Sequence, residues 1–371
     1  MSTPPAITIA GAENAHQSFK DSFSYSSYLR LEQLLAAQQP LTDAHDEVLF
    51  ITIHHVQEVW MSLIIKELTG AMAKLTAGDF EPAMKMLARV SRAQEQMGAA
   101  WEVLKTMTPA DYLEFRSAFG KASGFQSWQY RTVEFLLGNR QRYMLKPFAE
   151  QPDHLAKLTA IIESPSLYDI ALQALVKRGL LSASALRSTF DAVTESNPEV
   201  LAAWLTVYRN TAAHWDLYYL AEKLVDVEDN FRRWRFNHVT TVERLIGHKT
   251  GSGGTTGVGY LRRALEVVLF PELWQVRSTL SHTALLAQSL MFAQVVPKGE
   301  APTESVALKQ TLVLGANKGG VHLNRAVNVA DGAPVIAIRL EPCGRTLLEM
   351  VEITAPGFTV VAVTSKMTSS P

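Results

Sequence analysis

Apolar residues recur at three- and four-residue spacing from about Tyr25 to Leu290, the spacing that keeps side chains on one face of a helix. Few stretches in this region alternate between apolar and polar residues as strands do. The longest run, VLFITIHHVQEVWMSLIIKELTGAMAKL, follows Asp43 and Asp46 and ends before the turn at Gly78. The pattern predicts an all-α main body, built as a multi-helix bundle.

A second long helix is predicted from about Glu199 to Leu245, with a break near Asn210 to Trp215. Spacings of 3, 4, 4 and 3 residues in its later half match the helical turn and form one stripe of side chains: Phe231, Trp234, His238, Val242 and Leu245. We therefore expect a histidine to face the interior of the bundle.

The composition changes near VVPKGEAPTES, beyond a glycine-rich loop, GSGGTTGVG, and a last helical stretch, LRRALEVVLFPELWQVRSTL. Downstream, the segments TLVLGA, APVIAIRLEP, RTLLEMVEI and FTVVAVTSK are rich in β-branched residues and alternate with period two. We predict three parts: a polar leader over residues 1–24, a helical domain over 25–295, and a linker with a small β-rich C-terminal module over 296–371.

Charge and cysteine content exclude several classes of protein. The 371 residues carry 35 Lys and Arg against 36 Asp and Glu, so a net charge of −1 gives no field to attract nucleic acid or an acidic membrane. The single cysteine, Cys343, excludes internal disulfides, thiolate zinc clusters and a covalently attached c-type haem. No basic leader with an apolar core is present, and no apolar run approaches the roughly 20 residues that span a bilayer. We predict a cytoplasmic protein.

Two histidines are candidates for chemistry. On a helix, His54 shares a face with Phe50, while His55 points about 100° away, so only one of the pair can look into a given pocket. His238 lies on the aromatic stripe, and haem iron needs a neutral imidazole from a rigid element in such an apolar slot. For each residue the alternative is a core histidine satisfied by neighbouring backbone.

A competing metal site comes from the pattern His45-Asp46-Glu47. Its histidine and carboxylate are typical of a non-haem iron triad, with His54 as a conceivable third ligand. Such short patterns arise often by chance, and acidic residues at a helix start are explained by the helix dipole.

Arg116, in DYLEFRSAFG, is a candidate for binding a carboxylate, because a guanidinium group pairs with it through two parallel hydrogen bonds. Tyr112 lies one turn earlier on the same face. The alternative is a surface arginine paired with a nearby acid. The glycine-rich loop has no phosphate-binding register, and it is expected to bring backbone N–H groups and the Ser252 hydroxyl near a small ligand, or else to be a plain linker.

From Phe125, the stretch FQSWQYRTVEFLLGNR resembles the tryptophan 2,3-dioxygenase family. Further stretches agree in order and spacing: SYSSYLRLEQLLAAQQPLTDAHDEVLFITIHHVQEVW, YLEFR, LAEKLVDVEDNFRRWRFNHVTTVERLIGHKTGSGGTTGVGYLRRAL and FPELWQVR. The resemblance runs from about Tyr25 to Leu280. It implies an all-helical enzyme that uses O2 to open the indole ring of L-tryptophan and gives N-formylkynurenine.

The resemblance also implies roles by position. His238 matches the axial ligand of a non-covalent haem b, and His54 matches the distal histidine that faces the indole nitrogen. Arg116 matches the clamp on the substrate carboxylate, and Ser252 stands where a threonine contacts the amino acid's charged groups. Haem contacts are implied for Trp101 and Ser123, and pocket positions for Phe50, Tyr112, Phe119, Ser123 and Tyr130. Tyr25, Tyr28 and Leu29 match a segment that enters a neighbouring subunit's pocket, which implies a homotetramer.

Three positions depart from the family pattern. His55 replaces a common glutamine, Ala122 a usual serine, and Ser252 the threonine of the glycine loop. These changes are mild in volume, but they leave the substrate open between L-tryptophan and a close derivative. A haem-dependent monooxygenase of a modified tryptophan, a non-haem iron oxygenase and a haem sensor or carrier are the alternatives.

Overall fold

The structure is a computed structural model that describes residues 22–186, 196–247, 249 and 257–280, together with short strand segments between residues 294 and 364. The chain divides into two compact units. The first comprises Met1–Gly70, Met86–Ser164 and Val227–Val267, and the second comprises Ala71–Lys85, Pro165–Asp226 and Val268–Pro371. The long helices α3 (His45–Ala77) and α10 (Trp215–Ile246) contribute residues to both.

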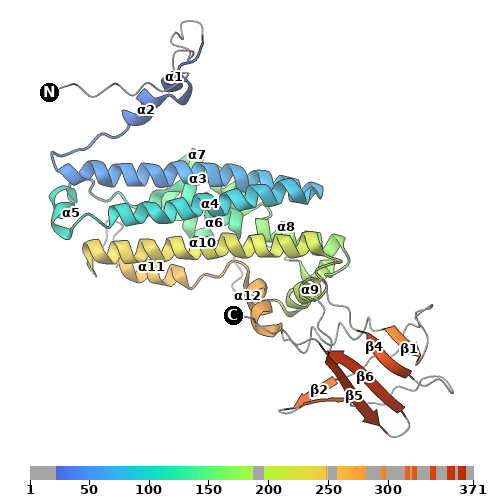
Figure 1. The fold of residues 1–371 in the computed structure, drawn as a ribbon. Helices are drawn as coiled ribbons and strands as arrows, with labels where there is room; N and C mark the ends of the chain where they lie inside the picture. Colours follow the sequence, from blue (N-terminus) through green and yellow to red (C-terminus); the bar gives the residue numbers. More distant parts are fainter. Residues whose placement is uncertain are drawn as a thin grey trace, which may run out of the picture. The chain divides into compact units, whose positions relative to one another are not determined.

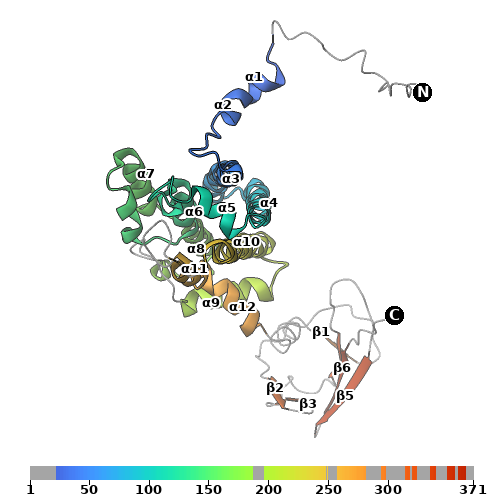
Figure 2. The ribbon, with the colours of Figure 1, turned by 90° about the vertical axis from the view of Figure 1, so that its left-hand side faces the viewer.

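Three helices form the centre of the first unit. In Figure 1, the first-unit parts of α3, α4 (Phe80–Leu104) and α10 run alongside one another, and Figure 2, which looks nearly along them, shows the same grouping. Gln57 links all three: its side-chain amide donates to the Met97 carbonyl of α4 at 2.9 Å and accepts from the Trp234 indole N–H of α10 at 2.9 Å.

Shorter helices complete this unit. They are α1 (Tyr25–Leu29), α2 (Leu31–Leu35), α5 (Pro109–Phe115), η2 (Gly124–Gln126), α6 (Trp128–Leu137), η3 (Arg142–Phe148), α7 (Pro152–Ile162) and α11 (Gly257–Leu265). Local sequence sets their ends. Thr108 and Asp111 form a capping box around Pro109 at the start of α5. Gly138, with φ 107°, ends α6 in the left-handed conformation that glycine adopts without strain.

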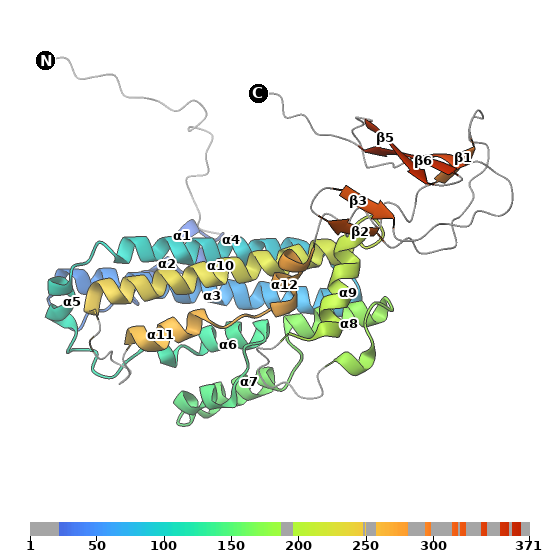
Figure 3. The same ribbon diagram turned by 90° about the horizontal axis from the view of Figure 1, so that it is seen from below.

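The core of the first unit is aliphatic between α3 and α4 and mixes aliphatic and aromatic side chains among α6, η3 and α7. Ile64, Leu68 and Leu87 are fully buried, and burying each such side chain stabilises the fold by about 1.5–3 kcal/mol. A second cluster joins α6, η3 and α7 through Phe135, Met144, Phe148, Leu158 and Ile162. Figure 3 shows α6 and α7 next to each other.

The second unit contains α8 (Leu167–Lys177), η4 (Ala183–Ala185), α9 (Pro198–Arg209), α12 (Pro271–Thr279) and the start of α10. Glu272 is buried, and its carboxylate accepts from the Tyr168 hydroxyl at 2.6 Å and from the Asn197 backbone N–H at 2.7 Å. These bonds join α8, α9 and α12 in the core of this unit.

The C-terminal strands are β1 (Gln294–Pro297), β2 (Leu314–Asn317), β3 (Gly320–Leu323), β4 (Val335–Arg339), β5 (Glu349–Ala355) and β6 (Phe358–Thr364). One sheet has the order β1-β4-β6-β5, and β2 pairs with β3. β5 and β6 are antiparallel, with Glu349 opposite Thr364, whereas β4 and β6 are parallel.

The predicted helical main body is confirmed. α3 has the predicted course and ends before Gly78, and the predicted second helix is broken between Arg209 and Trp215, where α9 ends and α10 begins. The last predicted helical stretch is two helices: α11 ends at Leu265, and α12 begins at Pro271, which occupies its first turn.

One helix bears on the expectation that the chain has no membrane partner. By length and composition α3 is apolar enough to cross a membrane. A single such helix is weak evidence for a membrane span, and 22% of its 18-residue apolar window is buried inside the protein.

Candidate functional site

His54 lies on α3, and one of its two ring nitrogens is engaged in a hydrogen bond to the backbone. Its Nδ1 is 2.7 Å from the Phe50 carbonyl oxygen, and because a carbonyl only accepts, Nδ1 carries the hydrogen. Burial lowers the pKa of His54, so the neutral ring is favoured and Nε2 keeps a lone pair. Among the described residues no hydrogen bond engages Nε2. This nitrogen is therefore an acceptor for an N–H group of a ligand.

Aromatic rings surround Phe50 on the α5 side of His54. The Phe50 ring is 4.1 Å from His54, 5.5 Å from both Phe115 and Phe119, and 6.0 Å from Tyr112. The rings of Phe50 and Phe119 stack at 12°. Phe115, which sequence reasoning did not select, is fully buried at the centre of this group. The cluster gives the site an apolar wall suited to a flat aromatic ligand.

Arg116 stands at the edge of this wall, one residue beyond α5. Its guanidinium carbon lies 4.9 Å from the centre of the Phe119 ring, and Nη1 donates to the Gly120 carbonyl at 3.2 Å. No carboxylate lies within salt-bridge distance of Arg116 in the part of the chain that the structure describes, so the alternative of a structural ion pair finds no support there. The remaining donors of the guanidinium can bind an anion.

His238 lies on α10 against two indoles. Its ring stacks on Trp101 at 4.7 Å and 8°, and its centre is 5.5 Å from that of Trp234. Burial, and then the nearby His54, lower the pKa of His238 to about 4, so the imidazole is neutral near pH 7. A neutral imidazole is the form that binds a metal ion.

His54 and His238 face the same indole. The Trp101 ring is perpendicular to His54, with centres 6.2 Å apart, and parallel to His238. Trp101 is buried, and its Nε1 has no hydrogen-bond partner within the described residues. Two desolvated imidazoles, flat indole walls and an unpaired buried donor fit a planar, partly polar group such as haem.

A buried charge cluster supports α10 beside His238. Glu134 of α6 pairs with Arg131 and lies 3.5 Å from Arg235, and all three residues are buried. Arg235 stacks at 4.3 Å on Phe231 and donates to the carbonyl of Ala264, at the end of α11. The cluster therefore joins α6, α10 and α11 three residues before His238.

Tyr130 belongs to this α10 side of the site. Its ring is 5.3 Å from Trp234 and 6.0 Å from Phe231. Burial, with the nearby Glu134 carboxylate, raises the pKa of Tyr130, so the hydroxyl is neutral. No described contact places Tyr130 with Phe50, its predicted companion in the pocket.

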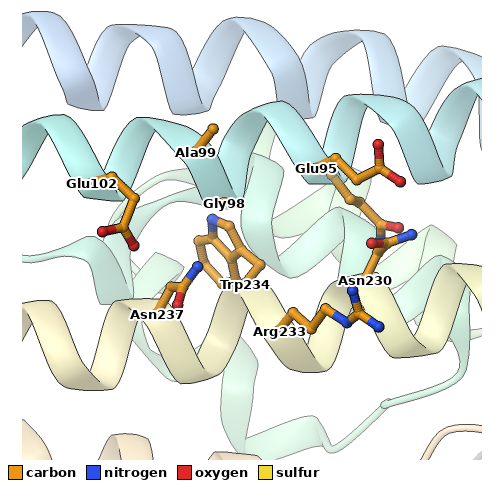
Figure 4. Close-up of a pocket in the computed structure, with 9 residues that line it drawn as sticks. Glu95, Gly98, Ala99, Glu102, Asn230, Arg233, Trp234 and Asn237 are labelled. Atoms are coloured by element: carbon orange, nitrogen blue, oxygen red, sulfur yellow. The ribbon is translucent and has the colours of Figure 1, made fainter.

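A cleft of about 190 Å³ lies between α4 and α10. Its lining residues are Gln94, Glu95, Gly98, Ala99, Glu102, Asn230, Arg233, Trp234 and Asn237. Figure 4 shows Glu102 beside Asn237 and, farther along, Arg233 beside Asn230. This surface differs from the aromatic wall at Phe50, and Trp234 is the lining residue that also contacts His238.

Several predicted site residues lie elsewhere or outside the described chain. Ser123 caps η2 through a pair of hydrogen bonds with Gln126. Tyr25, Tyr28 and Leu29 are exposed on α1, where no described residue of the Phe50 cluster contacts them. Ser252 lies outside the described residues.

The proposed non-haem iron ligands are not brought together. The Glu47 carboxylate accepts from the backbone N–H groups of Leu41 and Thr42 at 2.9 and 2.8 Å. Within the described residues, no group of three His, Cys, Asp or Glu side chains is arranged to hold a metal ion. The geometry therefore counts against a triad of His45, Glu47 and His54.

Comparison with known proteins identifies the family. The model of the family described as "Tryptophan 2,3-dioxygenase" matches residues 10–186 and 199–280. A protein named tryptophan 2,3-dioxygenase from Bradyrhizobium sp. (strain BTAi1) is 57% identical over 269 residues, which cover 72% of this chain and 96% of that protein. Proteins of that name from Cupriavidus necator and Pseudomonas fluorescens are 51% and 52% identical, over 73% and 75% of this chain and 92% and 98% of theirs.

The helical fold and these matches place the chain among the oxidoreductases, as an enzyme of the dioxygenase type. The chain belongs to the tryptophan 2,3-dioxygenase family. Membership of this family, which the sequence motifs predicted, is thereby confirmed. The family match ends at residue 280, before the predicted C-terminal module.

Proposed function

We propose that the protein is a haem-dependent dioxygenase that cleaves the indole ring of L-tryptophan with O2 to give N-formylkynurenine. The observation that carries the proposal is the pair of desolvated histidines, His54 and His238, which both contact the ring of Trp101. One imidazole is available to a metal, and the other presents an acceptor nitrogen beside an aromatic wall. The names of the relatives point to the same substrate.

His238 would hold the iron of a haem b, and Trp101, which stacks on the His238 ring, would contact the group. When bound, haem would supply a ferrous iron that binds and activates O2. Gln57 fixes Trp234, and the Glu134 cluster fixes the α10 backbone, so the imidazole is held by a rigid support. Ser123 is a further candidate for haem contact on the resemblance alone.

The substrate would be oriented at both ends. Arg116 would bind the carboxylate, with Ser252 near the charged groups of the amino acid, while Phe50 and Phe119 contact the indole. A substrate held at both ends has already lost most of its rotational freedom. Its reaction with oxygen therefore has a smaller entropic barrier. His54 Nε2 would accept the indole N–H, which orients the ring without removing its proton, because an indole is a very weak acid.

Assembly and location complete the proposal. We infer a homotetramer in the cytoplasm, with L-tryptophan and O2 as the small-molecule partners. The exposed aromatic residues of α1, Tyr25 and Tyr28, support this assembly, because exposed apolar patches mark interaction surfaces. We further propose that residues after about 296 form a small β-rich module separate from the helical domain, consistent with the end of the family match at residue 280.

The test is a spectrum of the purified protein, reduced with dithionite, with and without L-tryptophan. We expect a Soret band that shifts when the substrate is added, and N-formylkynurenine carrying both atoms of labelled O2. No Soret band, with activity lost to chelators, would indicate a non-haem iron oxygenase. One labelled atom in an intact ring would indicate a monooxygenase, and a haem spectrum without turnover a sensor or carrier.

A further inference from the structure

The chain between α2 and α3 is fastened to α3 by a buried carboxylate. Glu47 accepts hydrogen bonds from the backbone N–H groups of Leu41 and Thr42 and from the Thr42 hydroxyl at 2.6 Å. Burial opposes the charge on Glu47, but these donors outweigh it, and the pKa of the carboxyl lies below its usual value. This anchor fixes the connecting chain where it enters α3.

A second fastening lies closer to α2. The Gln38 side-chain Nε2 is 3.1 Å from His55 Nδ1 and 3.0 Å from the Leu34 carbonyl oxygen. An amide NH2 group has two hydrogens, so it can donate to both atoms at once. Nδ1 of His55 is then the acceptor, and its Nε2 carries the ring hydrogen. His55 therefore connects the end of α2 to α3.

The segment that these bonds hold contains α1 and α2, and these two short helices do not by themselves fix its direction. α1 and α2 are helices of five residues each, well below the length at which an isolated helix is stable in water. Apolar side chains in and just before these helices face solvent: Phe23 is 78% exposed, Tyr25 75%, Tyr28 73% and Leu35 64%. Anchoring by α3 therefore decides where this segment, the arm of residues 23–35, is presented.

We propose that His55 is a positioning residue: through its contact with Gln38 it sets the direction of the arm. The inference rests on the proposed function, in which the tyrosines of the arm, as the family resemblance implies, reach the substrate pocket of a second copy of this chain. Adjacent residues on a helix point about 100° apart, so His54 can face the substrate while His55 faces the connecting chain. The same turn of α3 thus serves one copy's pocket and the arm that completes another's.

The test compares His55→Leu, Gln38→Leu and the double variant, with apparent KM, kcat, haem content and subunit mass measured for each. Loss of one hydrogen bond that holds the arm should raise KM for L-tryptophan about three- to tenfold, with kcat within about twofold. The double variant should be no worse than the more impaired single variant, because both changes remove one bond. Haem content and the mass of the assembly should not change.

Two further variants separate positioning from general damage. His55→Gln should restore KM, because the glutamine oxygen can accept the same hydrogen bond from Gln38. Gln39→Leu is the matched control: it removes a neighbouring exposed glutamine whose side chain bonds only the Ala36 carbonyl among the described residues, and it should leave KM unchanged.

Unchanged KM in both single variants, additive losses in the double variant, or a His55→Gln protein as impaired as His55→Leu would overturn the proposal. If the unaltered protein binds no haem or does not turn over L-tryptophan, the proposed function fails instead. Haem binding and turnover of the parent protein test the proposed function, whereas the KM values of the variants test the role of His55. The two failures are therefore distinguishable.

Discussion

The two sides of the candidate site are held by different forces. On α10, polar bonds immobilise the support of His238: Gln57 binds the Trp234 indole, and Arg235 lies between Glu134 and the carbonyl of Ala264. On the α3 and α5 side, ring contacts dominate, and among the described residues Arg116 makes one hydrogen bond, to a backbone carbonyl. The difference fits the proposed roles, in which the first side would keep a bound haem and the second would exchange the substrate.

The largest test of this comparison removes the proposed metal ligand. His238→Ala should abolish stoichiometric haem retention, because the His238 imidazole is the only protein ligand proposed for the iron. The helical content should stay close to that of the parent protein. Haem content by Soret absorbance and helicity by far-ultraviolet circular dichroism measure both. His154→Ala is the matched control, since His154 stacks on Trp128 and bonds Gln151 on α7. A full Soret band in His238→Ala would refute the assignment.

The second test weakens the support and leaves the ligand in place. Glu134→Gln keeps the shape but leaves Arg131 and Arg235 buried without their shared carboxylate, a change that costs about 3–5 kcal/mol in free energy of unfolding. Glu163→Gln serves as control, because Glu163 is half exposed and its ion pair with Arg142 contributes about 0–1 kcal/mol. Equal denaturation midpoints for the two variants would show that the cluster does not hold α10.

The third test addresses the substrate side. Arg116→Leu should raise the apparent KM for L-tryptophan steeply, because losing a charged hydrogen bond at a desolvated site costs about 2–5 kcal/mol. Haem content should stay at the parent level, since Arg116 contacts Phe119 and Gly120 and not the His238 wall. Steady-state kinetics together with haem titration separate the two effects. An unaltered KM would eliminate the carboxylate clamp.

The same contrast explains which parts of the molecule were predictable from sequence. Helical periodicity located α3 and the break before α10, because apolar spacing reports which face of a helix is buried. It also placed His54 with Phe50 and His238 with Trp234, which are one turn apart.

Contacts between distant segments were missed. Gln57 bonds Trp234, 177 residues away, and Glu134 meets Arg235 across two helices, and no local pattern reports either pair. A glutamine or glutamate inside an apolar run is a weak signal of a buried partner, because solvated faces carry the same residues. Phe115 could have been predicted from sequence as part of the aromatic wall, because it lies three residues after Tyr112 on the same helix and so shares its face.

The smallest expected effect separates His54 from His55. Nδ1 of His54 is bonded to the Phe50 carbonyl, so His54 can bind the substrate only through Nε2, which accepts the indole N–H. A neutral hydrogen bond of this kind contributes roughly 0.5–1.5 kcal/mol. His54→Ala should therefore slow turnover of L-tryptophan by a few-fold to about tenfold.

The same variant should discriminate less against an N-methylated indole, which has no hydrogen to donate. His55→Ala should lower kcat less, because His55 faces Gln38 and acts through the arm. If His54 were only a core residue, its loss would lower the melting temperature and leave the preference between the two substrates intact. Turnover of both substrates by both variants decides between these roles: equal losses of kcat, or an unchanged preference in His54→Ala, would place the distal histidine elsewhere.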